Sequence, residues 1–266
     1  MGEPAALRHL GGDRRAPRPR RPADGVRDRS RIAALPRAGD DPRAATTGSG
    51  RHAVNRYALT FAVRPGSEAA VAGILSGYHR PPPGASGGGP PGGGPPRTLL
   101  DRTSVFMAGP TVVRVVDITC PPAEAIRHLA GRPQIRAVED RLRPHLLEPR
   151  DLSDEDDRRR FLATSAMRVA GRRGTAERGA PRTAALYRAL PGRGREVAGL
   201  LAAEAPLDGA VTVFRRHDLV VHLTESAAPG HAPGSPPVPL AGLLAPLVRL
   251  ARPMTLVTDR VVEVAA

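Results

Sequence analysis

The first regular pattern along the chain is an alternation of large apolar residues with small or polar ones from residue 57 to residue 64. Every second side chain is large and apolar, which is the period of a half-buried strand: Tyr57, Leu59, Phe61 and Val63. A Pro-Gly pair follows, and then apolar residues recur on one face of a helix that we expect to end near Gly77: Val71, Ile74 and Leu75. The pattern therefore predicts a strand and then a helix.

Two runs of strand-forming residues come next, over residues 99–108 and 111–118, on either side of a Gly-Pro pair, and the second run is β-branched. A tight turn between two such runs predicts a β-hairpin. Helical spacing returns over residues 123–142, with an interruption at Pro133. We expect a short final strand over residues 144–148 to complete this part of the chain.

A further helix is expected after this strand, because Ser153 is a good N-cap residue and acidic residues fill the turn that follows it. We expect the helix to lead into a linker over residues 168–182, which hold five Arg and one Glu. The same order of elements is then predicted once more: a strand over 183–190, a helix over 192–205, a hairpin over 210–225, a helix over 240–251 and a strand over 254–264.

The order of elements recurs because the sequence itself is duplicated. Residues 104–115 (SVFMAGPTVVRV) match residues 212–223 (TVFRRHDLVVHL) without gaps, at an offset of 108 residues (222 − 114). Residues 64–75 match residues 190–201 at an offset of 126 residues (191 − 65). The two offsets differ by 18 residues, which is the length of the Pro- and Gly-rich insert at 79–96. An internal repeat of this length indicates two copies of one folding unit.

Two copies of the order βαββαβ predict an α+β protein made of two tandem ferredoxin-like repeats. Each antiparallel sheet would carry helices on one face, and its second face would be covered by the other copy, which is a dimeric-α/β-barrel-type architecture. The predicted boundaries are an Arg- and Pro-rich tail over 1–54, a first repeat over 55–167 with the insert 79–96, a linker over 168–182 and a second repeat over 183–266. The tail is expected to be disordered, or to reflect a gene start assigned too far upstream.

The net charge of +14 does not by itself indicate a nucleic-acid-binding protein. The excess of Arg is concentrated in the tail and in the linker, the chain contains no Lys, and aromatic residues make up 3% of it, with no Trp. Few side chains are therefore available to stack on bases. The chain has one cysteine, Cys120, and its most apolar stretch is interrupted by arginines and prolines, so we expect a cytoplasmic protein with no disulfide and no membrane span.

Short catalytic and cofactor-binding motifs give little support for a site of their own. The patterns G-x-S-x-G at residues 84–88 and G-x-G-x-x-G at residues 87–92 lie among prolines and glycines, without the strand and helix that each requires. The absence of Lys excludes a Walker-type phosphate loop and a Schiff base. His217 and His222 lie five residues apart with few acidic neighbours, so no metal and no other cofactor is expected.

Three stretches of the first repeat resemble the SchA/CurD-like domain of aromatic (type II) polyketide gene clusters, including those for spore pigments. They are RYALTFAVRPGSEAAVAGIL at 56–75, TSVFMAGPTVVRVVDI at 103–118 and RPQIRAVEDRLRPHLLEPRDLSD at 132–154. More distantly, the sequence is similar to tetracenomycin-type polyketide cyclases. The resemblance covers about residues 55–165 and implies the fold of a dimeric α/β barrel and a role in aromatic polyketide biosynthesis.

Arg114 and His222 occupy equivalent positions on the third strands of the two repeats, within runs that are otherwise apolar. On the helix-covered face of a sheet they would be polar groups in an apolar cavity, whereas at the barrel seam or in solvent they would be solvated or paired. Aldol cyclisation of a poly-β-ketone needs an apolar cavity, a donor that stabilises the enolate, and a base. The candidate catalytic residues are Arg114, His222 and Tyr57.

We therefore expect an accessory protein of spore pigment or antibiotic biosynthesis that binds a poly-β-ketone and closes its rings. One alternative is a cofactor-free monooxygenase that acts on an anthrone-like intermediate, although the absence of Trp makes it less attractive. Another is a non-catalytic scaffold for the polyketide synthase. The expected partners are an aromatic polyketide intermediate and type II polyketide synthase components, with the barrel formed within one chain or between two identical chains.

Overall fold

The computed structural model describes residues 54–77, 100–121, 124–125, 127, 132–204, 209–227 and 238–261. The expectations for the tail over residues 1–53 and for the insert 79–96 lie outside these residues. The strands are β1 (Asn55–Ala62), β2 (Leu100–Ala108), β3 (Thr111–Ile118), β4 (Ala166–Gly174), β5 (Arg182–Ala189), β6 (Ala210–Arg216), β7 (Leu219–Glu225) and β8 (Val248–Val261). The helices are α1 (Glu68–Ser76), α3 (Pro133–Leu142), α4 (Glu155–Ser165), α5 (Gly194–Ala203) and α6 (Val238–Leu244), with a short 3-10 helix η1 (Arg143–His145). None of these described helices combines the length and the apolar character that crossing a membrane requires.

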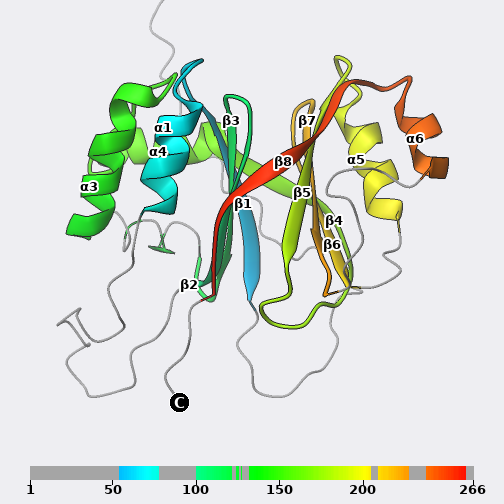
Figure 1. Ribbon diagram of the computed structural model, residues 1–266, viewed down its shortest axis with the longest axis horizontal. Coiled ribbons are helices and arrows are strands. Elements are labelled where there is room, and N and C mark those ends of the chain that lie inside the picture. The colour runs from blue at the N-terminus through cyan, green and yellow to red at the C-terminus, as the bar shows by residue number, and fades with distance from the viewer. Residues whose placement is uncertain are drawn as a thin grey trace, which may run out of the picture. The chain divides into compact units, whose positions relative to one another are not determined.

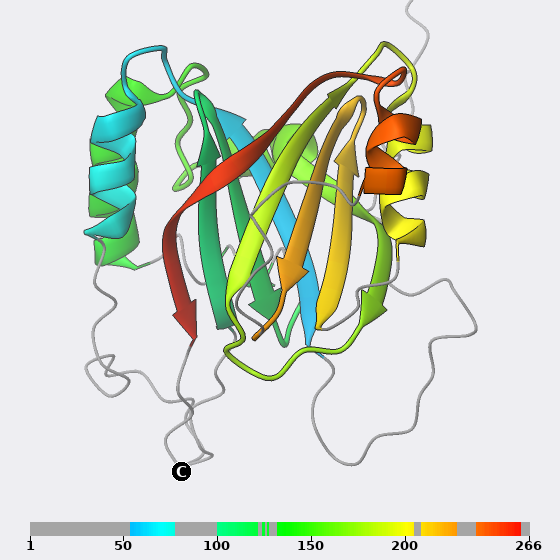
Figure 2. The same cartoon turned by 45° about the vertical axis from the view of Figure 1, so that its right-hand side comes forward.

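The described strands form a closed antiparallel barrel in the order β1-β3-β2-β8-β5-β7-β6-β4 (Figure 1). Two strands join its halves. β8 pairs first with β5, from Val248 to Met254, and then with β2, from Thr255 to Val261, so it crosses from one half to the other (Figure 2). β4 begins opposite β1 and continues along β6. Each described strand therefore has a neighbour on both sides, and β4 and β8 pair with each of their two neighbours over only part of their length.

The predicted mixed α/β fold with an antiparallel barrel is confirmed. The hairpin of β2 and β3 turns at Gly109, whose φ of +54° lies in the left-handed region that favours glycine. The hairpin of β6 and β7 turns at His217, where φ is also positive, at 52°. α1 buries the three predicted apolar residues and is capped by Gly77. Both hairpins and the first helix could thus be read from local patterns.

Strand pairing has the same register in the two halves. Leu59 lies opposite Arg114 where β1 pairs with β3, and Ala185 lies opposite His222 where β5 pairs with β7. The two residues on the first strands are 126 positions apart (185 − 59), and the two on the third strands are 108 apart (222 − 114). These are the two offsets of the sequence repeat, so residues that match in sequence occupy matching places in the sheets.

Two expectations for the end of the first half are wrong. The strand expected over residues 144–148 does not form, because the chain enters η1 there and Leu146 makes only a single bridge with Val63. The fourth strand is instead β4, which occupies the first part of the region expected to be a linker, 168–182. Its Arg- and Gly-rich sequence has little local strand character, and its place is set by pairing with β6 in the other half.

The predicted boundary between the last helix and the last strand is also wrong. α6 ends at Leu244, and residues 248–251 belong to β8 rather than to a helix over 240–251. Pairing of the first part of β8 with β5 overrides the helical spacing of these residues. A smaller difference concerns α4, where Asp154 rather than Ser153 is the N-cap.

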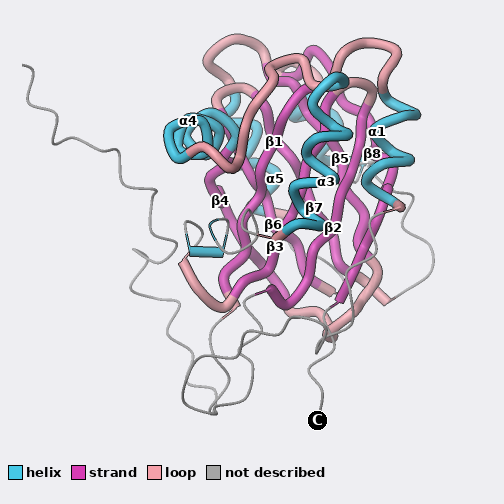
Figure 3. Tube along the Cα trace, turned by 90° about the vertical axis from the view of Figure 1, so that its left-hand side faces the viewer, coloured by secondary structure: helices cyan, strands magenta, loops and turns pink. Residues whose placement is uncertain are grey.

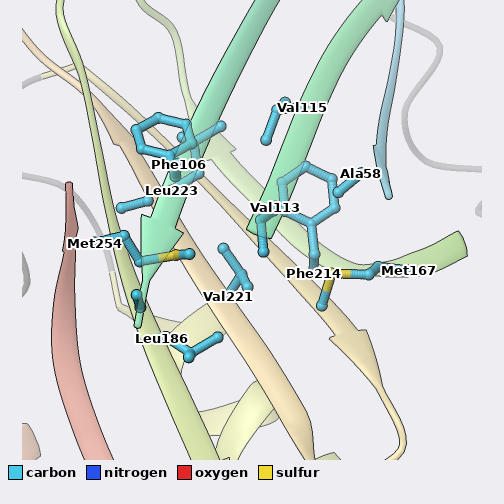
Figure 4. Close-up of a cluster of buried hydrophobic side chains, with 12 residues drawn as sticks. Ala58, Phe106, Val113, Val115, Met167, Leu186, Phe214, Val221, Leu223 and Met254 are labelled. Atoms are coloured by element: carbon cyan, nitrogen blue, oxygen red, sulfur yellow. The ribbon is translucent and has the colours of Figure 1, made fainter. Parts of the chain in front are cut away.

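Alternate strand residues point into the barrel and out toward the helices. The interior core draws on both halves and includes Ala58, Phe106, Val113, Val115, Met167, Leu186, Phe214, Val221, Leu223 and Met254 (Figure 4). On the outside, α1 and α3 lie over the strands of the first half (Figure 3), and α5 and α6 lie over those of the second (Figure 1). Each half therefore packs one face of its strands on the other half and the opposite face on helices, as predicted.

A network of buried ion pairs fills one end of the barrel, where β1, β2 and β5 begin. The guanidinium of Arg56 donates to both oxygens of Asp117, at 2.7 and 3.0 Å, and also to Glu225. Arg182 donates to Glu225 at 2.9 Å and to Asp117. Arg102 adds a further pair with Asp259, at 2.9 Å. Three arginines thus face three carboxylates drawn from both halves of the chain.

The arginines keep these carboxylates ionised. Burial alone would raise the pKa of Asp117 and of Glu225, but the hydrogen bonds and charges of Arg56 and Arg182 outweigh burial and hold both pKa values below their usual range. A buried charge without its partner is far less stable than the complete pair. Removing any one charged side chain of the network would therefore leave an unpaired buried charge and destabilise the fold.

We predict that Glu225→Gln lowers the free energy of unfolding by about 3–5 kcal/mol, because it leaves Arg56 and Arg182 to share one carboxylate inside the barrel. Urea denaturation followed by circular dichroism measures the change. The matched control is Asp140→Asn, which removes an exposed carboxylate paired with Arg143 and should cost less than about 1 kcal/mol. Equal effects of the two variants would show that the network does not stabilise the barrel.

Candidate functional site

His222 lies on β7 and faces α5, outside the barrel. It shares this face of the sheet with Val220, which belongs to the same apolar cluster as Val197 and Leu201 of α5. The side chain is 12% exposed. Of the positions considered from the sequence, His222 therefore occupies the helix-covered face and not the barrel seam or the surface.

The N-terminal end of α5 is fixed to the hairpin that carries His222. Asp218, in the turn between β6 and β7, accepts hydrogen bonds from the backbone N–H groups of Gly192 and Gly194, both at 3.0 Å. These two donors lower the pKa of Asp218. A side chain at Gly194 would meet the carbonyl oxygen of His217 at 2.1 Å, so glycine is needed for this close approach.

The C-terminal end of α5 is held against β4. A β-carbon at Gly171 would lie 2.4 Å from the β-carbon of Ala202, so only glycine lets the helix come this near. The guanidinium of Arg173 donates to the carbonyl oxygen of Ala202 at 2.6 Å and satisfies a backbone acceptor that the last helical turn leaves open. These contacts place Glu204, the residue after α5, above His222.

Three buried polar groups meet beneath this end of α5. An Oε2 atom of Glu204 lies 3.9 Å from Nε2 of His222, which is longer than a hydrogen bond. Tyr187 lies on β5, beside β7, and its side chain belongs to the same apolar cluster as α5. Within the described part of the chain, neither the Tyr187 hydroxyl nor His222 Nε2 has a hydrogen-bond partner, although both atoms are buried.

Burial sets the protonation state of this group. It lowers the pKa of His222 to about 4, so the imidazole is neutral near pH 7. Burial, together with the charge of Glu204, raises the pKa of Tyr187 to about 12, so the phenol keeps its proton. The site therefore offers a neutral imidazole that can accept a proton and a hydroxyl that can donate a hydrogen bond.

Arg114 and Tyr57 lie on the outer face of the first half. The Nε–H of Arg114 donates to Thr103 Oγ1 at 3.2 Å, and the guanidinium is half-buried. Tyr57 packs in a small apolar cluster with Cys120. Burial and the charge of the Cys120 thiolate raise the pKa of Tyr57. Tyr57 lies opposite Val116, two residues from Arg114 on β3, so the two candidates are diagonal neighbours.

The structure does not bring the three candidate residues into one site. Arg114 on β3 and Tyr57 on β1 lie on the outer face of the first half, whereas His222 on β7 lies on the outer face of the second half, which packs on α5. The apolar interior core lies between the two faces. The candidates therefore form two separate groups.

The two halves differ at the position of Tyr187. Its equivalent, at the offset of 126 residues, is Phe61, and each of these residues lies opposite a valine in the matching register. The guanidinium of Arg150 lies 4.6 Å from the centre of the Phe61 ring and 4.1 Å from that of Phe161, and its charge is paired with Glu139. The first half therefore has no hydroxyl at this place and covers the ring with a cation.

Sequence reasoning missed Tyr187 and Glu204. The repeat itself contains a signal for Tyr187, because aligning the two first strands places a tyrosine against Phe61. Glu204 gives no such signal, since its position depends on how α5 ends and packs on β4. As to metals, the described residues contain no cluster of three or more side chains of the types that bind them.

We predict that His222 makes the protein less stable in mild acid. The pKa of His222 is about 4 in the folded protein and about 6.5 in the unfolded chain. Its contribution to the free energy of unfolding, about 3 kcal/mol, is therefore complete above pH 6.5 and is lost as the pH falls toward 4. Among the described residues, the titratable groups grouped with the imidazole are those of Tyr187 and Glu204. His222→Gln should remove this slope from urea denaturation series at pH 7, 6 and 5. The control His217→Asn, in the exposed turn, should keep it, and an unchanged slope in His222→Gln would contradict the assignment.

Comparison with known proteins identifies the first half. Residues 54–173 match the SchA/CurD like domain. The chain is 39% identical over 201 residues to polyketide synthase CurD of Streptomyces cyaneus, covering 71% of this chain and 52% of that protein. It is 39% identical over 183 residues to a 42.8 kDa protein in the whiE locus of Streptomyces coelicolor, covering 65% and 44%. The chain thus spans about half the length of these curated relatives.

A solved structure of a candidate monooxygenase from Fusobacterium nucleatum superposes on 77% of this chain and 93% of its own, with 7% sequence identity and a TM-score of 0.39. The sequence matches are much more specific, and they confirm the resemblance on which the first half was recognised. Residues 54–173 of this chain are therefore similar to the SchA/CurD like domain along their whole length.

Proposed function

We propose that the protein acts in the biosynthesis of an aromatic polyketide, where it binds a poly-β-ketone and promotes ring closure with His222 as the base. The SchA/CurD-like domain, and the naming of a curated relative as a polyketide synthase, support the pathway. The buried, neutral imidazole of His222 supports the reaction, and it is the observation on which this proposal rests.

Ring closure by an aldol reaction needs a proton to be moved twice. A base removes a proton from a CH₂ group between two carbonyls, the carbanion forms a C–C bond with a carbonyl carbon further along the same chain, and the resulting alkoxide takes up a proton. Neutral His222 can accept the first proton at Nε2 and return it to the alkoxide, so no oxidant or reductant is consumed. General base catalysis of this kind is worth about 10²–10⁴-fold in rate.

Glu204 supports this role by its charge. Its carboxylate lies 3.9 Å from His222 Nε2 and stabilises the imidazolium that forms after the first proton transfer. Within the same proposal, Arg114 and Tyr57 serve a separate place on the first half, where a guanidinium and a phenol can hold a carbonyl oxygen of a long substrate. Type II polyketide synthase components are the protein partners that this function requires.

We also infer that the barrel consists of two tandem ferredoxin-like repeats, so that one chain forms an internal pseudo-dimer. In each half the first strand lies between the third and the fourth, with the second outermost: β4-β1-β3-β2 and β8-β5-β7-β6. The equal pairing registers of the two halves support a duplication.

We predict that His222→Ala abolishes the ring-closed product in the producing strain, while the purified variant keeps its circular dichroism spectrum. His217→Asn, on the same hairpin but exposed, should leave the product unchanged. Liquid chromatography with mass spectrometry of the culture extracts measures both. Full product formation by His222→Ala would overturn the proposal.

A strain that lacks the protein distinguishes the proposed cyclase from the two alternatives, a monooxygenase and a non-catalytic scaffold. Loss of a cyclase gives a shunt product with altered ring closure. Loss of a monooxygenase that acts on an anthrone-like ring leaves the reduced ring in the product. Loss of a scaffold lowers the yield of an unchanged compound.

A further inference from the structure

We propose that the hydroxyl of Tyr187 anchors a carbonyl oxygen of the ligand, that His222 takes up the adjacent enol proton, and that only the second half of the barrel carries this site. The inference rests on the proposed function, because it names the chemical unit that the base acts on. That unit is a 1,3-dicarbonyl group in its enol form.

The Tyr187 hydroxyl is buried without a hydrogen-bond acceptor among the described residues, which is energetically unfavourable. The residue is 1% exposed, its hydroxyl is buried, and within the described part of the chain that hydroxyl has no hydrogen-bond partner. Burying a donor without an acceptor costs free energy, and most buried hydroxyls in proteins are paired for this reason. An acceptor supplied by a ligand would repay that cost on binding.

His222 presents the complementary atom next to this donor. Tyr187 and His222 lie on adjacent strands and on the same face of the sheet, since Tyr187 is opposite Val220 and His222 is two residues further along β7. Glu204 interacts with both side chains, which places all three under the end of α5. A donor and an acceptor are thus offered side by side.

The pair selects a definite ligand chemistry. The phenol keeps its proton and can donate a hydrogen bond to an acceptor such as a carbonyl oxygen, and a neutral imidazole nitrogen can accept a hydrogen bond from an enol O–H or a proton from carbon. The surrounding side chains are apolar and favour an otherwise apolar molecule: Val197, Leu201, Val211, Val213 and Val220. An enolised 1,3-dicarbonyl carries the acceptor, its carbonyl oxygen, and the acidic proton, its enol O–H, on two carbons that are separated by a single carbon.

The first half shows that the fold does not need the hydroxyl. Phe61 occupies the position equivalent to Tyr187, in the same strand register, and its ring packs with Arg150 and Phe161. The sheet therefore accepts a phenylalanine at this place. The oxygen atom of Tyr187 is an addition specific to the second half, and a ligand role accounts for it better than packing does.

The test is Tyr187→Phe in the full chain, with 1-phenylbutane-1,3-dione as the probe. We expect the melting temperature of the free variant to be equal to or higher than that of the wild type, because an unpaired buried hydroxyl is removed. We expect its affinity for the probe, followed by the ultraviolet absorbance of the enol, to fall at least tenfold. Thr183→Val, which removes a hydroxyl from the same face of β5, is the control and should leave both values unchanged.

Three results would overturn the inference: no saturable binding of the probe by the wild type, equal affinity in Tyr187→Phe, or a clear fall in the melting temperature of the free variant.

Failure of this inference can be distinguished from failure of the proposed function. Loss of ring-closed product in His222→Ala with normal probe binding in Tyr187→Phe keeps the function and removes the anchor. A tenfold loss of probe affinity in Tyr187→Phe with normal product in His222→Ala keeps the site and removes the function.

Discussion

Closure of the barrel by β4 and β8 determines which faces of the strands pack together and which are covered by helices. Both strands pair with one half at their first residues and with the other half further along, so the two sheets become one surface. With the inner face filled by an apolar core common to both halves, the outer faces are left to the helices. This division puts His222 under α5 and keeps it away from Arg114 and Tyr57.

The parts of the fold that could be predicted from the sequence are those set by local patterns. Both hairpins and α1 follow from alternation, turn residues and helical spacing within short windows. β4 and the first part of β8 could not be predicted, since the Arg- and Gly-rich sequence of Ala166–Gly174 and the helical spacing of residues 248–251 give way to strands only through partners far along the chain. The internal sequence repeat supplied the long-range information that single segments lack, and the barrel was predicted from it.

The candidate site, too, could be predicted only where the sequence repeat points to a residue. Comparing the repeats singled out His222 because a polar residue interrupts an apolar strand at an equivalent position in both copies, and the structure buries that residue under a helix. Tyr187 was missed because it differs from Phe61, its equivalent in the first half, by only one oxygen atom. Glu204 depends on the close approach of Ala202 to Gly171, which no pattern in the sequence reports.

The path of β8 has a consequence for synthesis on the ribosome. β2 belongs to the first half, yet one of its two neighbours is β8, the last strand of the barrel to be translated. Until that strand has emerged, β2 offers a row of unpaired backbone groups to any other extended chain. The apolar inner face of the first half stays uncovered over the same interval. Nascent chains of this protein are therefore expected to depend on chaperones until the C-terminal strand is in place.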